Sequence, residues 1–205
     1  MKIKSYTLAE AVIVVFILGI IVTFLLATLR PKDYKTEAYK KAGLNHYLAI
    51  GIATKQLLAK YSSNYNMTGL KTTAGADFSI VDSGADAKLA PLYKIMLRGA
   101  SYTAPSGYSG TVIKNEAGTA VGANGGYKIS DFTQGFQARN NMYFALKLNR
   151  NCTTTESYIY DPSVIEKRTA AKSCGLILFD VNADAEPNIA GVDIYIISIG
   201  KMGIK

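Results

Sequence analysis

The sequence predicts an α+β protein in which one long N-terminal helix, transmembrane in its first half, packs on a C-terminal antiparallel β-sheet. Two observations support this fold class. Residues 11–29 form an unbroken apolar run, and the chain continues to about residue 61 with apolar side chains at helical spacing. Three segments near the C-terminus are rich in β-branched and aromatic residues, which favour strands. A helix followed by a run of strands is the order expected for an α+β architecture.

The apolar run from Ala11 to Leu29 has the length of a membrane span. Its 19 residues would extend about 28 Å as a helix, against a hydrocarbon core of ~30 Å. A cleavable secretory signal with a cut after Ala27 is the alternative, but the apolar part of such signals is usually only about 7–15 residues long. Glu10 stands at the mouth of the run, and an ionisable group at or near bilayer depth is costly, roughly 2.5–3.5 kcal/mol for Asp at the centre of a membrane helix. A functional reason for Glu10 is therefore expected.

Residues 31–62 are predicted to form the soluble half of the same helix. Pro31 is expected to kink it, because proline removes a backbone donor and clashes with the preceding turn. Apolar residues recur after it at spacings of three and four, which predicts a helix face that packs on a core. The predicted core face comprises Tyr47, Ile50, Ala53, Leu57 and Tyr61, widened by Leu44, Leu48 and Ile52.

Residues 63–205 are predicted to form a globular, β-rich domain. Its first part is rich in Ser, Asn, Thr and Gly and is expected to consist of long loops at 63–90 and 99–126. The predicted antiparallel strands follow at 142–148, 174–181 and 192–199.

The charge and the cysteines limit the function classes. A formal net charge of +8 and a pI near 9.3 would suit a polyanionic partner, but the basic residues are scattered and no nucleic-acid-binding motif accompanies them. The sequence therefore argues against nucleic acid as a partner. Cys152 and Cys174 are the only cysteines, and an even count in an exported chain predicts one disulfide. Two unrelated buried thiols are the alternative.

The N-terminal motif Tyr6-Thr7-Leu8-Ala9-Glu10, followed by the apolar run, resembles the prepilin-type N-terminus of type IV pilins and type II secretion pseudopilins. The resemblance implies that residues 1–5 are a leader peptide, cut between Ser5 and Tyr6 by a prepilin peptidase, and that the new N-terminus is methylated. Glycine usually precedes the cut, and Ser5 in its place implies slower or altered processing.

The same resemblance gives residues 6–30 a second role, as the transmembrane helix that becomes the core of a helical filament. Glu10 occupies the position of the family's invariant glutamate. We expect its carboxylate to neutralise the amine of Tyr6 on a neighbouring subunit and so to set the axial register, because an unpaired charge in an apolar core is strongly penalised. The alternative is that Glu10 lies at the membrane edge and stays hydrated.

The C-terminal segment resembles the ending of a bacterial group of pseudopilin-like proteins. Asp180, Asn182 and Asp184 alternate like the oxygen ligands of calcium loops, and some secretion pseudopilins bind calcium in a C-terminal loop, so this loop is a candidate calcium site. A turn whose Asp and Asn side chains cap backbone amides is the alternative. The matching residues are Cys174, Asp180, Val181, Asn182, Pro187, Asn188, Gly191 and Asp193, while Ala183 and Glu186 stand where glycines are common.

These observations predict a structural protein and not an enzyme. The only histidine, His46, has no metal-ligand companion at helical spacing, and no nucleophile motif is present. The implied function is a subunit of a type IV pilus or type II secretion pseudopilus. Its implied partners are identical or related pilin subunits, a prepilin peptidase and an assembly platform in the cytoplasmic membrane.

The implied location is the inner membrane, crossed once, with the C-terminal domain periplasmic or extracellular, and the filament after assembly. The alternative function is a minor pilin-like binding module for DNA, a surface or a secreted cargo, with the tyrosines of 101–110 as candidate contacts.

Overall fold

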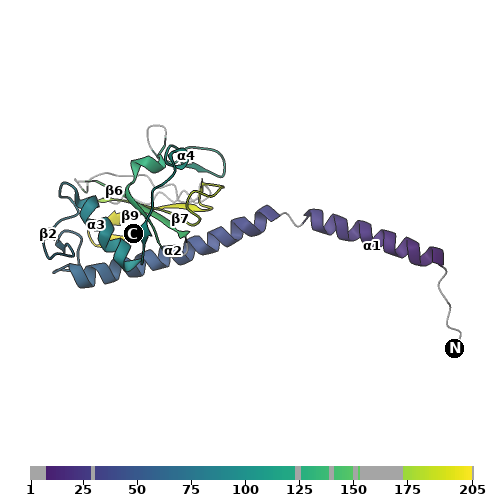
Figure 1. The fold of residues 1–205 in the computed structure, drawn as a ribbon, viewed down its shortest axis with the longest axis horizontal. Coiled ribbons are helices and arrows are strands. Elements are labelled where there is room, and N and C mark those ends of the chain that lie inside the picture. The colour runs from purple at the N-terminus through teal and green to yellow at the C-terminus, as the bar shows by residue number, and fades with distance from the viewer. Residues whose placement is uncertain are drawn as a thin grey trace, which may run out of the picture. The chain divides into compact units, whose positions relative to one another are not determined.

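The structure is a computed structural model that describes residues 8–28, 31–122, 126–138, 141–149, 152 and 173–204. In its N-terminal part, side chains are described for residues 12–22 and from residue 34 onward. The chain divides into two compact units, Met1–Glu37 and Ala38–Lys205. The larger unit carries the sheet (Figure 1).

Two helices stand where one was predicted. Helix α1 covers Leu8–Thr28 and helix α2 covers Pro31–Tyr61. Proline suits the first position of a helix, because its fixed φ is helical and its missing N–H would have no partner there. Pro31 thus begins a helix instead of kinking one. The prediction of one long N-terminal helix packed on the sheet is wrong, because α1 lies in the smaller unit and only residues of α2 enter the core of the larger one.

The membrane prediction is also contradicted. Over the described part of the chain, none of the helices has the combination of length and apolar character that a membrane crossing needs. The transmembrane assignment of residues 6–30 and the single-pass inner-membrane location are corrected accordingly.

The main sheet of the larger unit is mixed and not purely antiparallel, which is a further correction. Its eight strands run in the order β3-β5-β6-β7-β9-β8-β4, with β10 also paired to β9. The β4–β8 and β8–β9 pairs are parallel and the others are antiparallel. The strands are β3 (Ala100–Ser101), β4 (Lys114–Asn115), β5 (Thr133–Gln137), β6 (Tyr143–Leu148), β7 (Gly175–Asp180), β8 (Ile189–Ala190), β9 (Ile194–Gly200) and β10 (Gly203–Ile204). The three predicted strands correspond to β6, β7 and β9, the centre of this sheet.

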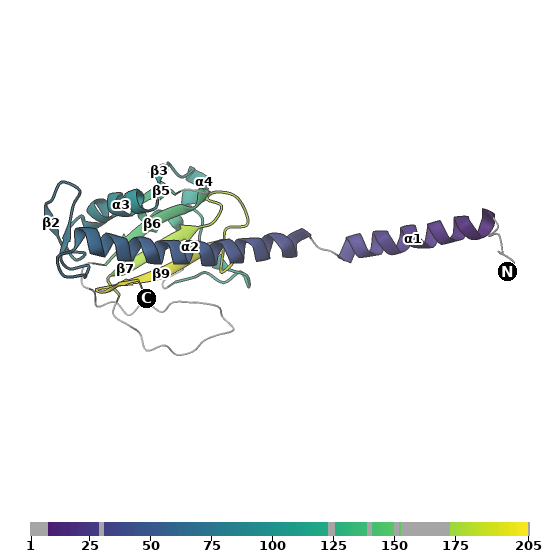
Figure 2. The same cartoon turned by 90° about the horizontal axis from the view of Figure 1, so that it is seen from below.

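Helices α2 and α3 (Ala85–Met96) cover one face of the sheet (Figure 2). Side chains alternate between the two faces of a strand, so every second residue of β6, β7 and β9 enters this layer. Thr54 of α2 joins the two helices, because its hydroxyl hydrogen-bonds to the hydroxyl of Tyr93 at 2.8 Å and donates to the carbonyl of Ile50. The central buried residues of the layer are Ile50, Ala53, Leu57, Leu89, Leu92, Tyr93, Phe144, Leu146, Ile177, Phe179, Ile197 and Ile199.

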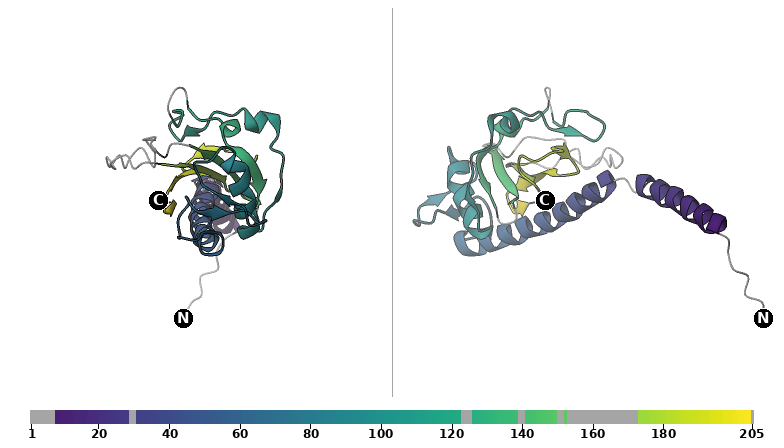
Figure 3. Two further views of the ribbon diagram at one scale, coloured as in Figure 1. Left: turned by 90° about the vertical axis from the view of Figure 1, so that its left-hand side faces the viewer. Right: turned by 45° about the vertical axis from the view of Figure 1, so that its right-hand side comes forward.

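The opposite face is covered by the segment between β3 and β5. This segment contains the one-turn helix α4 (Ser106–Ser109) and the 3₁₀ turn η1 (Ile129–Asp131), and Figure 3 shows it across the sheet from α2. Strand β7 is buried along its whole length, because both faces of the sheet are covered. The residues of this second core are Tyr108, Ile113, Val121, Ile129, Phe132, Tyr143, Ala145, Leu176, Leu178, Ala183 and Ile194.

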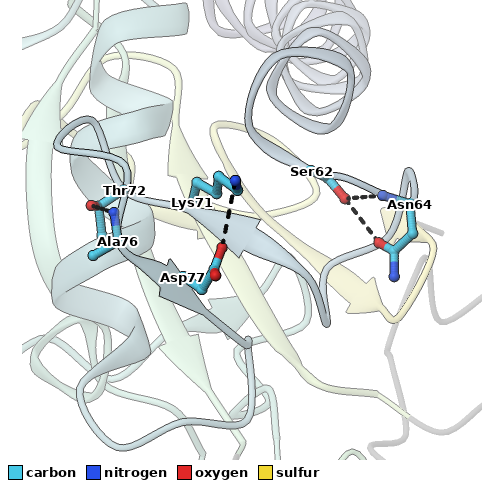
Figure 4. Close-up of polar contacts among 6 residues, drawn as sticks. All are labelled: Ser62, Asn64, Lys71, Thr72, Ala76 and Asp77. Carbon is cyan, nitrogen blue, oxygen red and sulfur yellow. Dashed lines mark hydrogen bonds and ion pairs between the residues drawn. The ribbon is translucent and has the colours of Figure 1, made fainter.

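A small two-stranded ribbon, β1 (Leu70–Lys71) with β2 (Asp77–Phe78), follows α2. Figure 4 shows the polar contacts that shape this end of the unit. The amide of Ala76 donates to the hydroxyl of Thr72 at 3.1 Å, and Lys71 lies 3.9 Å from the carboxylate of Asp77. The ribbon tip, including Thr73, is exposed.

Candidate functional site

Helix α1 presents apolar side chains on all of its sides. Every residue from Val12 to Val22 is exposed, and the ten large apolar side chains in this stretch are each between 47% and 69% exposed. An amphipathic surface helix would bury one face and expose polar residues on the other. Val12–Val22, which we call the α1 apolar surface, contains no charged or polar side chain, and exposed apolar surfaces of this kind are typical of interaction sites.

The residues predicted for leader cleavage and for the axial register of the filament are Ser5, Tyr6 and Glu10, and the structure describes little of them. Ser5 and Tyr6 fall outside the described residues. Glu10 lies within helix α1, but its side chain is not among those described. Their predicted roles in cleavage and assembly therefore stay predictions.

The predicted disulfide is confirmed. Cys152 and Cys174 are bonded, and both are buried in the core layer beneath α2 and α3. Cys174 immediately precedes β7, where its amide donates to the carbonyl of Ile199 on the neighbouring strand β9 at 2.7 Å. The bond therefore joins Cys152, which follows β6 in the chain, to the centre of the sheet.

The candidate calcium loop connects β7 to β9, and its two end aspartates are completely buried. Asp180 accepts hydrogen bonds from the hydroxyl of Tyr108 at 2.7 Å and from the amide of Asn182 at 3.1 Å. Asp193 accepts from the amides of Asn188 at 2.8 Å and Ile189 at 2.7 Å. Both carboxylates thus fix the loop backbone, as the capping alternative expects.

These bonds bear on whether calcium fits. Calcium takes six to eight oxygen ligands, whereas each carboxylate oxygen of Asp180 already accepts a hydrogen bond. One oxygen of Asp184 accepts from the hydroxyl of Tyr102 at 3.0 Å, and the side-chain amide nitrogen of Asn182 donates to the backbone carbonyl of Glu186 at 3.1 Å. The described residues contain no group of three or more His, Cys, Asp or Glu side chains placed to hold a metal ion. The calcium site at Asp180, Asn182 and Asp184 therefore stays a prediction.

Burial determines the protonation of this loop. Desolvation raises the pKa of Asp180 to about 8, and the hydrogen bonds from Tyr108 and Asn182 offset only part of that effect. Burial also raises the pKa of Asp193, against the opposing effect of its backbone donors. Near neutral pH, Asp180 therefore retains a proton that an exposed carboxyl would have lost.

The two tyrosines of residues 101–110, Tyr102 and Tyr108, donate hydrogen bonds to aspartates of this loop. Tyr108 is buried, and the rings of Tyr102 and Tyr108 each meet Tyr143 edge to face, with centroids 5.7 Å apart. Their hydroxyl bonds to Asp184 and Asp180 span more than 70 residues of sequence. No local sequence signal could have paired these residues, because the pairing depends on the segment folding over the second face of the sheet.

Helix α2 carries an apolar stripe that the sequence placed in the core. Leu44, Leu48 and Ile52 are each more than half exposed, so their predicted core position is wrong. The predicted residues Ile50, Ala53 and Leu57 are buried as expected. His46 is half-buried beside the stripe, and desolvation lowers its pKa.

Comparison of the chain with protein-family models, curated proteins and solved structures finds no match. The function is therefore argued from the geometry and from the N-terminal motif.

Proposed function

We propose that this chain is a structural subunit that assembles into a helical filament through helix α1, in the manner of type IV pilins and type II secretion pseudopilins. The observation that carries the proposal is the α1 apolar surface. The prepilin-like motif around Tyr6 and Glu10 supports it independently, as does the domain stabilised by a disulfide.

The size of the α1 apolar surface favours an assembly with many neighbours over a simple pair. Burying one large apolar side chain contributes about 1.5–3 kcal/mol, so covering the exposed part of ten such side chains would contribute roughly 10 kcal/mol per subunit. A single neighbour that covers one side would contribute about half of this, which the association cost of about 4–15 kcal/mol would cancel. Neighbours on all sides are needed, and contacts that do not close on themselves generate a filament.

Before assembly, the leader is removed between Ser5 and Tyr6 by a prepilin peptidase. An assembly platform and other pilin-like subunits are the further partners of the proposed function. Within the filament, Glu10 of one subunit neutralises the amine of Tyr6 on the next. This pairing lets the charged start of the helix enter an otherwise apolar environment.

Filament shearing from the native host tests the proposal. The chain should be recovered in the sheared filaments, and N-terminal mass analysis should find Tyr6 as the first residue, carrying a methyl group. A mature chain that begins near Thr28 would indicate an ordinary signal peptide and refute the proposal.

Glu10→Leu supplies a sharper test of the register role. Leader removal should continue, while incorporation into sheared filaments, measured against the cell-bound pool, should fall at least tenfold. Normal incorporation of this variant would show that the charge is not an assembly device.

A further inference from the structure

A groove of about 300 Å³ opens on the larger unit between α2, the end of α3, and Ala138 and Met142, which lie between β5 and β6 in the sequence. Ala53 and Met142 are its buried lining residues on α2 and before β6, and Ile52 is an exposed lining residue. The volume corresponds to roughly ten water molecules, which is space for two or three branched apolar side chains. The groove is lined by His46, Ala49, Ile52, Ala53, Gln56, Met96, Leu97, Arg98, Ala138 and Met142.

Exposed apolar side chains lie on both helices that border this groove. Leu44, Leu48 and Ile52 follow one another at intervals of four along α2 and so share one face of the helix. Ile95 is exposed at the end of α3, next to the lining residue Met96. Outside α1, the exposed large apolar residues of the described chain are Tyr34, Leu44, Tyr47, Leu48, Ile52, Tyr65, Ile95 and Met202, of which Ile52 lines the groove.

The groove also indicates which occupant it suits. Its lining contains no carboxylate, and Arg98, the arginine of the lining, is exposed, so its guanidinium can stay in water at the edge of the groove. An uncharged apolar helix could therefore cover the apolar lining residues and the neighbouring Ile52 without burying an unpaired charge. The α1 apolar surface is such a segment, and it is apolar on every side.

A filament of α1 helices alone would leave the outward sides of those helices uncovered. A helix that is apolar all round is stable in water only when it is covered all round. On the larger unit, Leu44, Leu48 and Ile52 of α2 and Ile95 of α3 expose apolar side chains, and Ile52 also lines the groove. They can therefore supply the missing cover.

We propose that the groove between α2 and α3 receives apolar side chains of helix α1 from a second copy of this chain. This inference rests on the proposed filament function and deepens it by naming the receiving surface. The competing occupants are helix α1 of the same chain and an unrelated protein.

Photocrosslinking in assembled filaments tests the occupant. The photoreactive residue benzoylphenylalanine replaces Ile52 in the full-length chain, and filaments are grown from an equal mixture of ¹⁴N- and ¹⁵N-labelled subunits. Mixed-isotope crosslinks from position 52 to peptides of Leu8–Thr28 are expected. The same photoreactive residue at Thr73, on the exposed β1–β2 tip, is the matched control and should give no crosslink to α1.

Ala49→Arg tests the surface without relying on crosslinking. Ala49 is exposed and lines the groove, so arginine there should leave the fold intact while placing a charge where an apolar helix would bind. The fraction of chain in sheared filaments should fall at least tenfold. Thr73→Arg adds the same charge away from the groove and should change that fraction less than twofold.

The outcomes separate the two proposals. If filaments form but position 52 crosslinks only within one chain, to another segment or to another protein, the groove inference is overturned and the filament function stands. Normal assembly of Ala49→Arg likewise overturns the inference alone. If the unmodified chain forms no filaments in its native host, both proposals fail.

Discussion

Replacing Gly43 or Gly51 by alanine adds the same methyl group at two points of helix α2, with opposite expected effects on stability. Helix propensity alone predicts a gain of about 0.8–1.0 kcal/mol at each position. At Gly51 the new methyl would lie 3.6 Å from a methyl group of Ile204, an ordinary van der Waals contact. Gly51→Ala should therefore stabilise the larger unit by about 0.5–1 kcal/mol.

At Gly43 the new methyl would overlap the ring of Tyr195. That ring cannot easily move, because it stacks on Phe179 with centroids 5.1 Å apart and its hydroxyl donates to the carbonyl of Val192 at 2.8 Å. Overpacking of this kind costs about 1–3 kcal/mol, which exceeds the gain in propensity. Gly43→Ala should therefore destabilise the unit by about 1–2 kcal/mol.

Urea denaturation of both variants beside the parent chain measures these effects, with near-ultraviolet circular dichroism of the tyrosines as the signal. The midpoint should rise for Gly51→Ala and fall for Gly43→Ala. A gain in stability for Gly43→Ala would mean that helix α2 does not lie against strand β9 as described.

Three further predictions concern the loop and the disulfide. Because burial raises the pKa of Asp180 to about 8, the folded form holds this proton more tightly than the unfolded chain. Stability should therefore fall between about pH 4 and pH 8 by up to about 1.4 kcal/mol per pH unit. Asp180→Asn should flatten that slope in urea denaturation with EDTA present, and an unchanged slope would contradict the assigned burial. Replacing Cys152 and Cys174 by serine should lower the free energy of unfolding by about 3 kcal/mol, as expected for a loop of this length. If the loop aspartates act as backbone caps, calcium at millimolar concentration should leave the melting temperature unchanged, and a rise of several degrees would support the calcium site at Asp180, Asn182 and Asp184.

The parts of the fold that the sequence predicts are those with a strong local signal. Strands β6, β7 and β9 are dense in β-branched and aromatic residues, and two cysteines allow only one pairing. Strands β4 and β8 contain two residues each, which is too few for any periodicity. The sequence therefore does not predict the parallel pairing of β4 with β8 and of β8 with β9. An apolar stripe at helical spacing shows that a helix has an apolar face, but it does not show whether the residues that pack on this face belong to the same domain. The spacing therefore predicts a core position for Leu48 and Ile52, although the structure exposes both.

The features of the candidate site also differ in whether the sequence predicts them. The α1 apolar surface and the motif around Glu10 are visible in a few consecutive residues. The bonds from Tyr102 and Tyr108 to the loop aspartates, and the groove between α2 and α3, join segments far apart in sequence. They arise only once both faces of the sheet are covered.

The disulfide has a consequence for the engineering of this protein. Because Cys152 and Cys174 are bonded to each other, the chain between them is a covalently closed loop whose two ends are held at one point beside β7. Strand β6 precedes this loop in the sequence and strand β7 follows it. A change of length between the two cysteines would alter the loop without moving its ends, so the pairing of β6 with β7 should tolerate it.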